Sequence, residues 1–441
     1  MSTILTNPVI LATTILVVLC LLKVNVFLSI IIASLCCALL GGATLVEGIE
    51  VFYTNMGNDN RMVLFLLLLG VLAATMQYNN VGEVLAPRVA KLVGKKVWLF
   101  PIVLTLFGIM VETFVLIGVS FLLVIVPPLL RLLTDYKVDR RLLVITTCCG
   151  LQIGYCCFPV GYGAGFMGIV QGALADNGLE VSIDQIWRAN LVIGGAMVVA
   201  IILAMIRYRK PRDYQSTEGE NKLIEAELAA AKELPPIEFR HIACLISGLS
   251  VVVVQVTTKS MPLAALVMIV MLVVTGAIKP RDFETVFMKG IMTSSYVCLV
   301  LMAAVAFAAT AKTYGDLDNL IAASGALIGG NKIFGAFLML FLGLFITMGI
   351  GSAFSTVPIV ATVLVPLGLS LKMSPALIII LVAASGALGD SGSPSSNQAL
   401  IPTAAFNIDG QHDHIRDSCI PSFLFVNIPL FVICTFAALF L

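Results

Sequence analysis

Charged residues are scarce in this chain of 441 residues: only 12% are Asp, Glu, Lys or Arg, while 59% are hydrophobic and the mean hydropathy is +1.05. A surface of this composition cannot be kept in water, so a soluble globular protein is excluded. The formal net charge of +1 also gives no electrostatic basis for a nucleic-acid partner. We therefore predict an integral membrane protein whose main partner is the lipid bilayer.

The motifs of enzymes are also absent from the sequence. It has no nucleotide-binding fingerprint, no nucleophile with a paired base and no soluble segment long enough to form a catalytic domain. The 11 cysteines have no CxxC spacing, and adjacent pairs on a helix point in different directions, so buried apolar cysteines are favoured over disulfides or metal ligands. His412 and His414 have ligand-like spacing, but they fall in a predicted loop. We expect no enzyme activity and no cofactor other than a coupling ion, Na⁺ or H⁺.

Long apolar runs, roughly 16 to 22 residues each, recur along the whole sequence, and each is long enough as a helix to cross a bilayer. The runs are apolar on all sides instead of alternating, which excludes the strands of a membrane β-barrel. The first run has no basic residue before it and no cleavage site after it, so we expect a retained helix. The predicted spans lie near residues 7–22, 24–45, 62–80, 142–175 and 186–208, and near 241–257, 261–279, 293–312, 375–404 and 420–441.

The sequence repeats itself at an offset of 235 positions. Val-Phe and Ala-Ala-Thr of residues 51–85 recur in residues 286–320, and the same offset pairs Gly94 with Gly329, Gly154 with Gly389, and Pro159 with Pro394. Two homologous halves with matching interruptions are typical of secondary transporters. We predict a first repeat at 1–208, a cytoplasmic linker at 209–240 and a second repeat at 241–441.

Two further segments, 98–133 and 333–371, have small or polar residues at their middle. Each can form two full spans or one re-entrant hairpin that enters and leaves the membrane on the same side. Lys and Arg lie on both flanks of 98–133, which places both flanks in the cytoplasm and favours a hairpin. Each half then has an odd number of spans, about five, so the second half is inverted relative to the first and both termini lie outside.

The predicted fold is therefore an all-α polytopic membrane protein with about 10 spans. It is an inverted repeat of two five-helix halves. Each half carries one re-entrant hairpin, at 98–133 and at 333–371, and one broken helix, at 142–175 and at 375–404.

The predicted interruptions are rich in glycine, proline and hydroxyl groups. They lie at the hairpin tips, 109–120 and 347–358, and at the span breaks, 154–165 and 389–400. Gly and Pro end a helix, which frees backbone carbonyls to hold a cation and exposes helix N-termini that favour an anion. The alternative is that these small residues only allow close helix packing. The candidate binding residues are Glu112, Thr113, Gly154, Tyr155, Pro159, Tyr162, Gly351, Ser352, Ser355, Thr356, Asp390, Ser391, Ser393, Pro394, Ser395, Ser396 and Asn397.

Two carboxylates, Glu112 and Asp390, fall inside these interruptions. An acid within the membrane is costly, so we expect each to bind a cation or carry a proton, with the capping of a half-helix N-terminus as the alternative. Tyr155 and Tyr162 either pack over a solute or fill the bundle, and Lys312 either reaches the interface or neutralises a solute carboxylate. A Na⁺ site is predicted from the oxygens of Ser352, Ser355, Thr356, Asp390 and Asn397.

The run GDSGSPSSNQALIPTAAFNIDGQHDHIRDSCIPSFLFVNIPL at 389–430, with PPLL at 127–130 and DRR at 139–141, resembles the Na⁺/H⁺ antiporter (NhaC-like) type families of the ion-transporter superfamily. The resemblance is closest to the bacterial histidine-permease-like branch and covers essentially the whole chain. It implies scaffold and transport domains that each draw on both repeats, an elevator-type movement, a homodimer and the bacterial cytoplasmic (inner) membrane. Superfamily members have Ser-Asn-Thr hairpin tips beside their cation sites, whereas the first tip here has Glu112-Thr113.

The leading hypothesis is a secondary active transporter that couples Na⁺ or H⁺ to the movement of a small organic solute, and the solute we favour is an amino acid such as histidine. It rests on the abundance of neutral ligands beside the two acids, because exchange of Na⁺ for H⁺ alone needs only one or two titrating groups. The alternative is a Na⁺/H⁺ antiporter that uses Asp390 and Glu112. A channel is disfavoured, because closed hairpins that carry carboxylates do not form an open pore.

Overall fold

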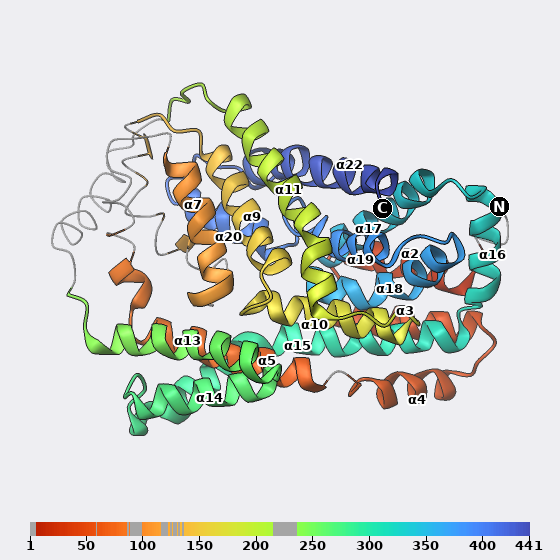
Figure 1. The fold of residues 1–441 in the computed structure, drawn as a ribbon, viewed down its shortest axis with the longest axis horizontal. Helices are drawn as coiled ribbons and strands as arrows, with labels where there is room; N and C mark the ends of the chain where they lie inside the picture. Colours follow the sequence, from red (N-terminus) through yellow and green to blue (C-terminus); the bar gives the residue numbers. More distant parts are fainter. Residues whose placement is uncertain are drawn as a thin grey trace.

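The computed structural model describes residues 6–58, 60–85, 88, 99–115, 122–123, 126, 130, 133–134, 136–214 and 236–441. Every regular element in these ranges is helical (Figure 1). The first half contains α2 (Pro8–Leu21), α3 (Val26–Leu40), α4 (Leu45–Asn55), α5 (Asn60–Tyr78), α7 (Leu99–Met110), η1 (Val111–Val115), α9 (Arg140–Cys157), α10 (Tyr162–Asp176) and α11 (Ile183–Arg207). The second half contains α13 (Phe239–Thr258), α14 (Met261–Val274), η3 (Pro280–Asp282), α15 (Phe283–Tyr314), α16 (Leu317–Ile328), α17 (Lys332–Ile350), α18 (Ala353–Ser370), α19 (Pro375–Ala387), α20 (Asn397–Phe406), η4 (His414–Cys419), α21 (Ile420–Ser422), η5 (Phe423–Asn427), α22 (Ile428–Phe436) and η6 (Ala437–Leu439).

Seven helices in the described part of the chain are long and apolar enough to cross a membrane, and α9 with α10, bent by 56° at a short break, makes an eighth. The seven are α5, α11, α13, η3 with α15, α17, α18 and the run His414–Leu439. Large apolar side chains are exposed along them, such as Val256 at 64% and Ile206 at 61%, as expected of helices that face lipid. The polytopic all-helical class predicted from the sequence is confirmed.

Some helix boundaries differ from the predicted spans. The span expected at 24–45 ends at Leu40, and a separate helix, α4, begins after Thr44. Thr44 and Glu47 form a capping box there: the Glu47 amide donates to Thr44 Oγ1 over 3.3 Å, and the Thr44 amide donates to Glu47 Oε2 over 2.8 Å. α15 begins at Phe283, ten residues before the expected 293–312, and α16 was not predicted. α4 and α16 are each too short to cross the membrane, so a pattern of membrane-length apolar runs does not indicate them.

The helices follow the sequence repeat. The first residues of α3 and α14, of α9 and α19, and of α10 and α20 are each 235 positions apart. In three places, residues related by this offset touch each other. Gln152 Nε2 donates to Ala387 O over 2.9 Å, the Tyr155 hydroxyl donates to Asp390 Oδ2 over 2.7 Å, and Cys298 Sγ lies 3.7 Å from Val63 O.

Equivalent positions of two copies meet where a two-fold axis passes between the copies. An approximate two-fold axis beside Tyr155 and Asp390 would produce contacts of this kind. Such an axis in the membrane plane is what relates inverted repeats. The inversion itself, the placement of the termini and the domain boundary at 209–240 stay predictions, and residues 215–235 of that linker lie outside the described residues.

Three of the four predicted interruptions are present as breaks. Phe158–Gly161 separates α9 from α10, and Leu388–Ser396 separates α19 from α20. α17 and α18 are joined at Gly351 and Ser352, where Gly351 has a φ of 72°, a conformation that a side chain disfavours. Both α17 and α18 are long enough to cross, so segment 333–371 stays open to either alternative. In the first hairpin, α7 and η1 end at Val115, and residues 116–121 lie outside the described residues.

The helices pack in two groups that each draw on both halves. α5 lies along α15, which also packs on α3 and α4, while α13 and α14 pack on each other and α14 packs on α5 (Figure 1). In the other group, α9 packs on α7 and α11, and α19 packs on α11, α17 and α18. α2 packs on α3 and so belongs to the first group. The two groups meet mainly where α15 contacts α18 and where α2 contacts α17. The candidate site lies between them.

Candidate functional site

A cavity of about 400 Å³ lies where the interrupted helices meet. We call it the central cavity. Its wall is built from η1, the two span breaks and the junction of α17 with α18, and it is closed on the other side by α3, α5 and α15. The lining residues are Val26, Leu66, Glu112, Tyr155, Tyr162, Tyr296, Val297, Val300, Ile350, Gly351, Ser352, Ala353, Phe354, Ser355, Asp390, Ser395, Ser396, Asn397 and Gln398.

Hydrogen bonds of its own serines stabilise the break between α19 and α20. Ser393 Oγ donates to Met348 O over 2.8 Å and accepts from the Ser395 amide over 3.2 Å. Ser396 caps α20 by accepting from the Gln398 amide over 3.1 Å. Because Asn397 and Gln398 line the central cavity, α20 presents its N-terminus there, where the helix dipole favours negative charge.

Asp390 is a buried carboxylate, 5% exposed, whose oxygens both accept hydrogen bonds. Oδ1 accepts from the Ala353 amide at the start of α18 over 3.0 Å, and Oδ2 accepts from the Tyr155 hydroxyl over 2.7 Å. Gln398 Nε2 adds a long contact of 3.5 Å to Oδ2. This geometry matches the capping alternative, because the carboxylate satisfies a free amide of a helix N-terminus. It also leaves lone pairs of both oxygens available to a cation.

Glu112 lies in η1, a turn of π-helix, and is 8% exposed. Its carboxylate lines the central cavity and makes no hydrogen bond or ion pair within the described part of the chain. Short π-helical turns inside α-helices are frequent at functional sites. A buried carboxylate without partners is costly as an anion, so this position favours a protonated acid or a cation beside it.

Two glycines let the interrupted elements approach each other. A Cβ on Gly154 would stand 2.6 Å from the Cβ of Glu112, and a Cβ on Gly389 would stand 2.4 Å from the carbonyl carbon of Thr347. Glu112 and Thr347 are themselves 235 positions apart, so the same close crossing is built in both halves. The residue of the second repeat that is equivalent to Glu112 is therefore a threonine, Thr347.

The predicted site residues divide into two sets. Those that line the central cavity are Glu112, Tyr155, Tyr162, Gly351, Ser352, Ser355, Asp390, Ser395, Ser396 and Asn397. Those that are not in its wall are Thr113, Gly154, Pro159, Thr356, Ser391, Ser393 and Pro394. The two threonines of this second set donate their hydroxyls to backbone carbonyls one turn earlier. Thr113 donates to Ile109 O, and Thr356 donates to Ser352 O, each over 2.8 Å.

Four of the five predicted Na⁺ ligands line the central cavity, and Thr356 does not. Ser355 Oγ is buried without a hydrogen-bond partner and is therefore an open oxygen ligand. Within the described residues no group of three His, Cys, Asp or Glu side chains could hold a metal ion. A monovalent hard cation in this cavity would depend on neutral oxygens around one or two acids.

Two glutamines and two aromatic residues at the site were not predicted. Gln398 contacts Asp390, and Gln152 donates to Ser391 Oγ over 3.0 Å. The signal for Gln152 was an amide within an apolar span, and Gln398 belongs to the same polar run as Asp390. Phe354 lines the central cavity and packs against Tyr155 and Phe166, with ring centroids 5.9 and 5.6 Å apart. Tyr296 also lines the cavity, from α15.

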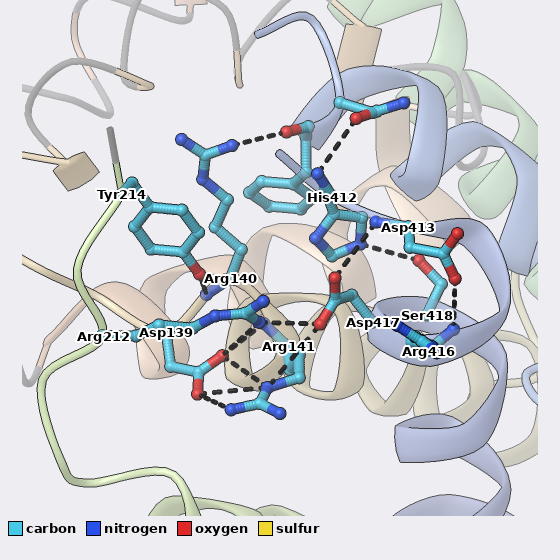
Figure 2. A network of polar contacts seen from close by, with 12 residues as sticks. Asp139, Arg140, Arg141, Arg212, Tyr214, His412, Asp413, Arg416, Asp417 and Ser418 are labelled. Atoms are coloured by element: carbon cyan, nitrogen blue, oxygen red, sulfur yellow. Dashed lines mark hydrogen bonds and ion pairs between the residues drawn. The ribbon is translucent and has the colours of Figure 1, made fainter. Parts of the chain in front are cut away.

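The motifs DRR and GQHDHIRD meet in a network of charged and polar side chains (Figure 2). Arg140 is fully buried and binds Asp409 through two contacts of 2.6 and 2.5 Å, while Arg212 binds Asp417 over 2.7 Å. His412 Nε2 lies 2.9 Å from Ser418 Oγ. Burial lowers the pKa of His412 from 6.5 to about 4, so the ring is neutral at physiological pH.

His414 extends this network towards the site. Its Nδ1 lies 2.8 Å from Thr403 Oγ1, and its Nε2 lies 3.0 Å from Pro394 O in the break before α20. Because a carbonyl only accepts, Nε2 carries the proton of this contact. Both histidines have partners within the protein, as expected of residues that hold the fold together rather than a metal.

Together, the interrupted helices, the buried acids and the membrane-spanning helices define the class of the protein, a membrane transporter. Residues 146–439 match the Na+/H+ antiporter family, and residues 7–93 match a second Na+-H+ antiporter family. A protein of Bacillus subtilis (strain 168), "Putative amino acid transporter YuiF", is 34% identical over 446 residues, which cover 99% of this chain and 100% of the relative. The chain belongs to the Na⁺/H⁺ antiporter family of NhaC-like type, as its C-terminal motif predicted.

Two solved transporters share the fold. The YdaH transporter of Alcanivorax borkumensis, described as having an unusual topology, superposes with a TM-score of 0.61 at 14% identity, over 97% of this chain and 98% of that one. Neisseria gonorrhoeae MtrF, described within a class of antimetabolite efflux pumps, superposes with a TM-score of 0.57 at 14% identity, over 89% of this chain and 83% of that one. At this identity the likeness concerns the fold alone.

Proposed function

We propose that the protein is a secondary active transporter that couples Na⁺ or H⁺ to the movement of a small organic solute, and that the solute is an amino acid of the histidine type. The observation that carries the proposal is the composition of the central cavity: an unpaired buried carboxylate, an open serine oxygen and a helix N-terminus face one space of about 400 Å³. The N-terminus of α20 suits a carboxylate, and Glu112 suits an ammonium group or a cation. The name of the Bacillus subtilis relative supports the same solute class.

The coupling ion is assigned to the two acids. Glu112 binds the cation or proton, because no group of the described chain neutralises it. Asp390, with the oxygens of Ser352, Ser355 and Asn397 beside it, contributes to the Na⁺ site.

The movement is proposed to be of elevator type within a homodimer. The two packing groups support this assignment: α3, α5, α13, α14 and α15 serve as the scaffold, and the helices that carry the breaks serve as the transport domain. The central cavity lies at the boundary between the two groups, where a moving transport domain would hold the solute and the coupling ion.

The test is uptake by purified protein in proteoliposomes, with labelled histidine and other amino acids under imposed Na⁺ or pH gradients. We expect accumulation against a concentration gradient that Glu112→Gln abolishes, while the same exchange at the exposed Glu284 leaves accumulation unchanged. The proposal is lost if no amino acid accumulates under any gradient.

The second candidate is a Na⁺/H⁺ antiporter that uses Glu112 and Asp390, and family membership favours it. The same vesicles decide between the two. Dissipation of a pH gradient by Na⁺, without solute and without any amino acid uptake, would establish the antiporter.

A further inference from the structure

A second cavity, of about 260 Å³, lies along the same helices as the central cavity. On α18, Phe354 lines the central cavity, and Pro358, one helical turn further on, lines the second. On α15, Val300 lines the first and Lys312 the second, twelve residues and about 18 Å along the helix axis. The two cavities therefore lie at different depths of one interface between the packing groups.

α10 shows what separates the two cavities. Tyr162, Phe166, Ile169, Ala173 and Asp176 follow one another at intervals of four and three residues, so they occupy one face of the helix. Tyr162 lines the central cavity, whereas Ile169, Ala173 and Asp176 line the second. Phe166 stands between them, fully buried, with its ring centroid 5.0 Å from that of Tyr155.

The polar groups of the second cavity form a mixed-charge set. The Lys312 ammonium donates to Asp176 O, the last carbonyl of α10, and it has two further protons to donate. The Asp176 carboxylate makes no ion pair or hydrogen bond with any described residue. Asn177 Oδ1 is buried and without a partner, while its Nδ2 donates to Ala173 O over 2.8 Å.

A cation, a free carboxylate and an orphaned amide oxygen around one small space match the two ends of a zwitterion. An α-amino acid has a carboxylate and an ammonium group one carbon apart, and a cavity of about 260 Å³ is below the size of drug-binding pockets, about 300 Å³ and above. A capping role for Lys312 at the end of α10 accounts for its contact with the carbonyl. It does not account for the buried Asn177 Oδ1, which has no partner beside it; the Asp176 carboxylate is exposed at the edge of the same space.

We propose that the second cavity is a separate binding site for a zwitterionic amino acid, with the solute carboxylate on Lys312 and its ammonium group on Asp176 and Asn177. The choice of an amino acid rests on the proposed function. The site would hold the solute on the far side of the aromatic contact of Phe166 with Phe354 and Tyr155, before or after its passage through the central cavity.

The test is protection of a single cysteine from a maleimide. Gly172 lines the second cavity, and a Cβ there meets no atom within 4 Å, so Gly172→Cys places a thiol in the site without a clash. Ten of the eleven native cysteines are buried, and Cys36→Ser removes the other. Gly325→Cys on α16 is the matched control, because it also meets no atom within 4 Å and lies outside this cavity.

We expect histidine at ten times its dissociation constant to slow labelling of Gly172→Cys about tenfold and to leave Gly325→Cys unchanged. Histamine, which lacks the carboxylate, and imidazole propionate, which lacks the ammonium group, should protect far less. Asp176→Asn and Lys312→Gln should each weaken protection about tenfold or more, since each removes a charge-assisted contact. The inference is overturned if neither histidine nor any of a panel of amino acids from each side-chain class slows the labelling.

A variant of the central cavity separates this inference from the proposed function. In Glu112→Gln, protection of Gly172→Cys should persist although transport is lost. Protection that disappears with Glu112→Gln would mean that the label reports a movement driven from the central cavity, and the separate site would be rejected. Protection without transport of any amino acid by the native protein would reject the proposed function and retain the site.

Discussion

Tyr155 and Asp390 hold the same position in the two repeats, and their side chains are hydrogen-bonded to each other. Two carboxylates in this place would repel each other, and two phenols would leave the α18 N-terminus without its acceptor. Divergence of the copies has produced an acid in one half and its hydrogen-bond donor in the other. Glu112 and Thr347 also hold equivalent positions with an acid in only one half, although these two side chains are not bonded to each other. Each half therefore supplies one acid to a shared cavity.

The first prediction concerns the hydroxyl of Tyr155. Tyr155→Phe removes the 2.7 Å hydrogen bond to Asp390 and leaves the ring in place. A hydrogen bond to a charged group contributes about 1.5–3 kcal/mol, so the concentration of coupling ion that gives half-maximal transport should change about tenfold or more. Tyr162→Phe is the control, because Tyr162 lines the same cavity without a side-chain hydrogen bond to any described residue. Equal ion dependence in the two variants would contradict the assigned role of Tyr155.

The second prediction concerns the close approach at Gly154. Gly154→Ala places a methyl group 2.6 Å from the Cβ of Glu112, which cannot rotate away. The crossing of η1 with α9 must widen, at a cost of about 1–3 kcal/mol in stability, and Glu112 must shift from its place in the cavity. We expect a lower melting temperature and a large loss of transport. Gly195→Ala, on α11 with no atom within 4 Å, should be neutral or stabilising, and a Gly154→Ala protein that transports normally would refute the argument.

At the scale of elements, the breaks could be predicted and the orientation of most side chains could not. Gly, Pro and Ser interrupt apolar runs, so the sequence indicates the breaks before Tyr162 and before Asn397 and the junction at Gly351 to within a few residues. Which side chain of a polar run faces the cavity depends on how each short helix is rotated by its neighbours, and pattern alone does not contain that. Ser391 therefore bonds to Gln152 of α9 and Ser393 to Met348 of α17, while Ser395 lines the cavity.

The short elements show a second limit of sequence reasoning. α4 has a capping box that indicates its start, but it is only 11 residues long, and α16 is only 12. Their stability comes from packing against long helices, since isolated helices of this length are marginal. Tertiary contacts of this kind, such as those of α4 with α15, are not visible in a hydropathy pattern.

The third prediction concerns the ion pair that joins Arg140, at the start of α9, to Asp409, in the loop after α20. Asp409→Asn leaves Arg140 fully buried without its counter-charge, and breaking a buried pair in this way costs about 3–5 kcal/mol. The melting temperature should fall clearly. Asp184→Asn breaks the exposed pair of Asp184 with Arg188, whose side chains are 58% and 67% exposed, and should change it little. A fall of equal size in both variants would show that the burial of Arg140 does not decide the cost.

At the scale of the whole molecule, the two cavities lie along the same three helices. α10, α15 and α18 each contribute residues to both cavities, and on α10 the ring of Phe166, in contact with Phe354, lies between them. The two solute sites proposed along this interface fit the proposal that one domain moves against a scaffold. If the repeats are inverted, exchanging the conformations of the two halves produces the opposite-facing state, so the two arrangements have similar energy.

The last prediction tests the inversion on which this exchange depends. If the second half is inverted, residues 241–441 cross the membrane an odd number of times, whether 333–371 is a hairpin or two spans, since both return the chain to the same side. A fluorescent protein inserted in the linker at 209–240 should then fluoresce in the cytoplasm, and alkaline phosphatase fused after Leu441 should be active outside. The reciprocal fusions, phosphatase in the linker and fluorescent protein at the C-terminus, should both be silent and serve as controls. Signals from both positions on one side would mean an even number of crossings, and the two halves would then be parallel repeats that cannot exchange conformations across the membrane.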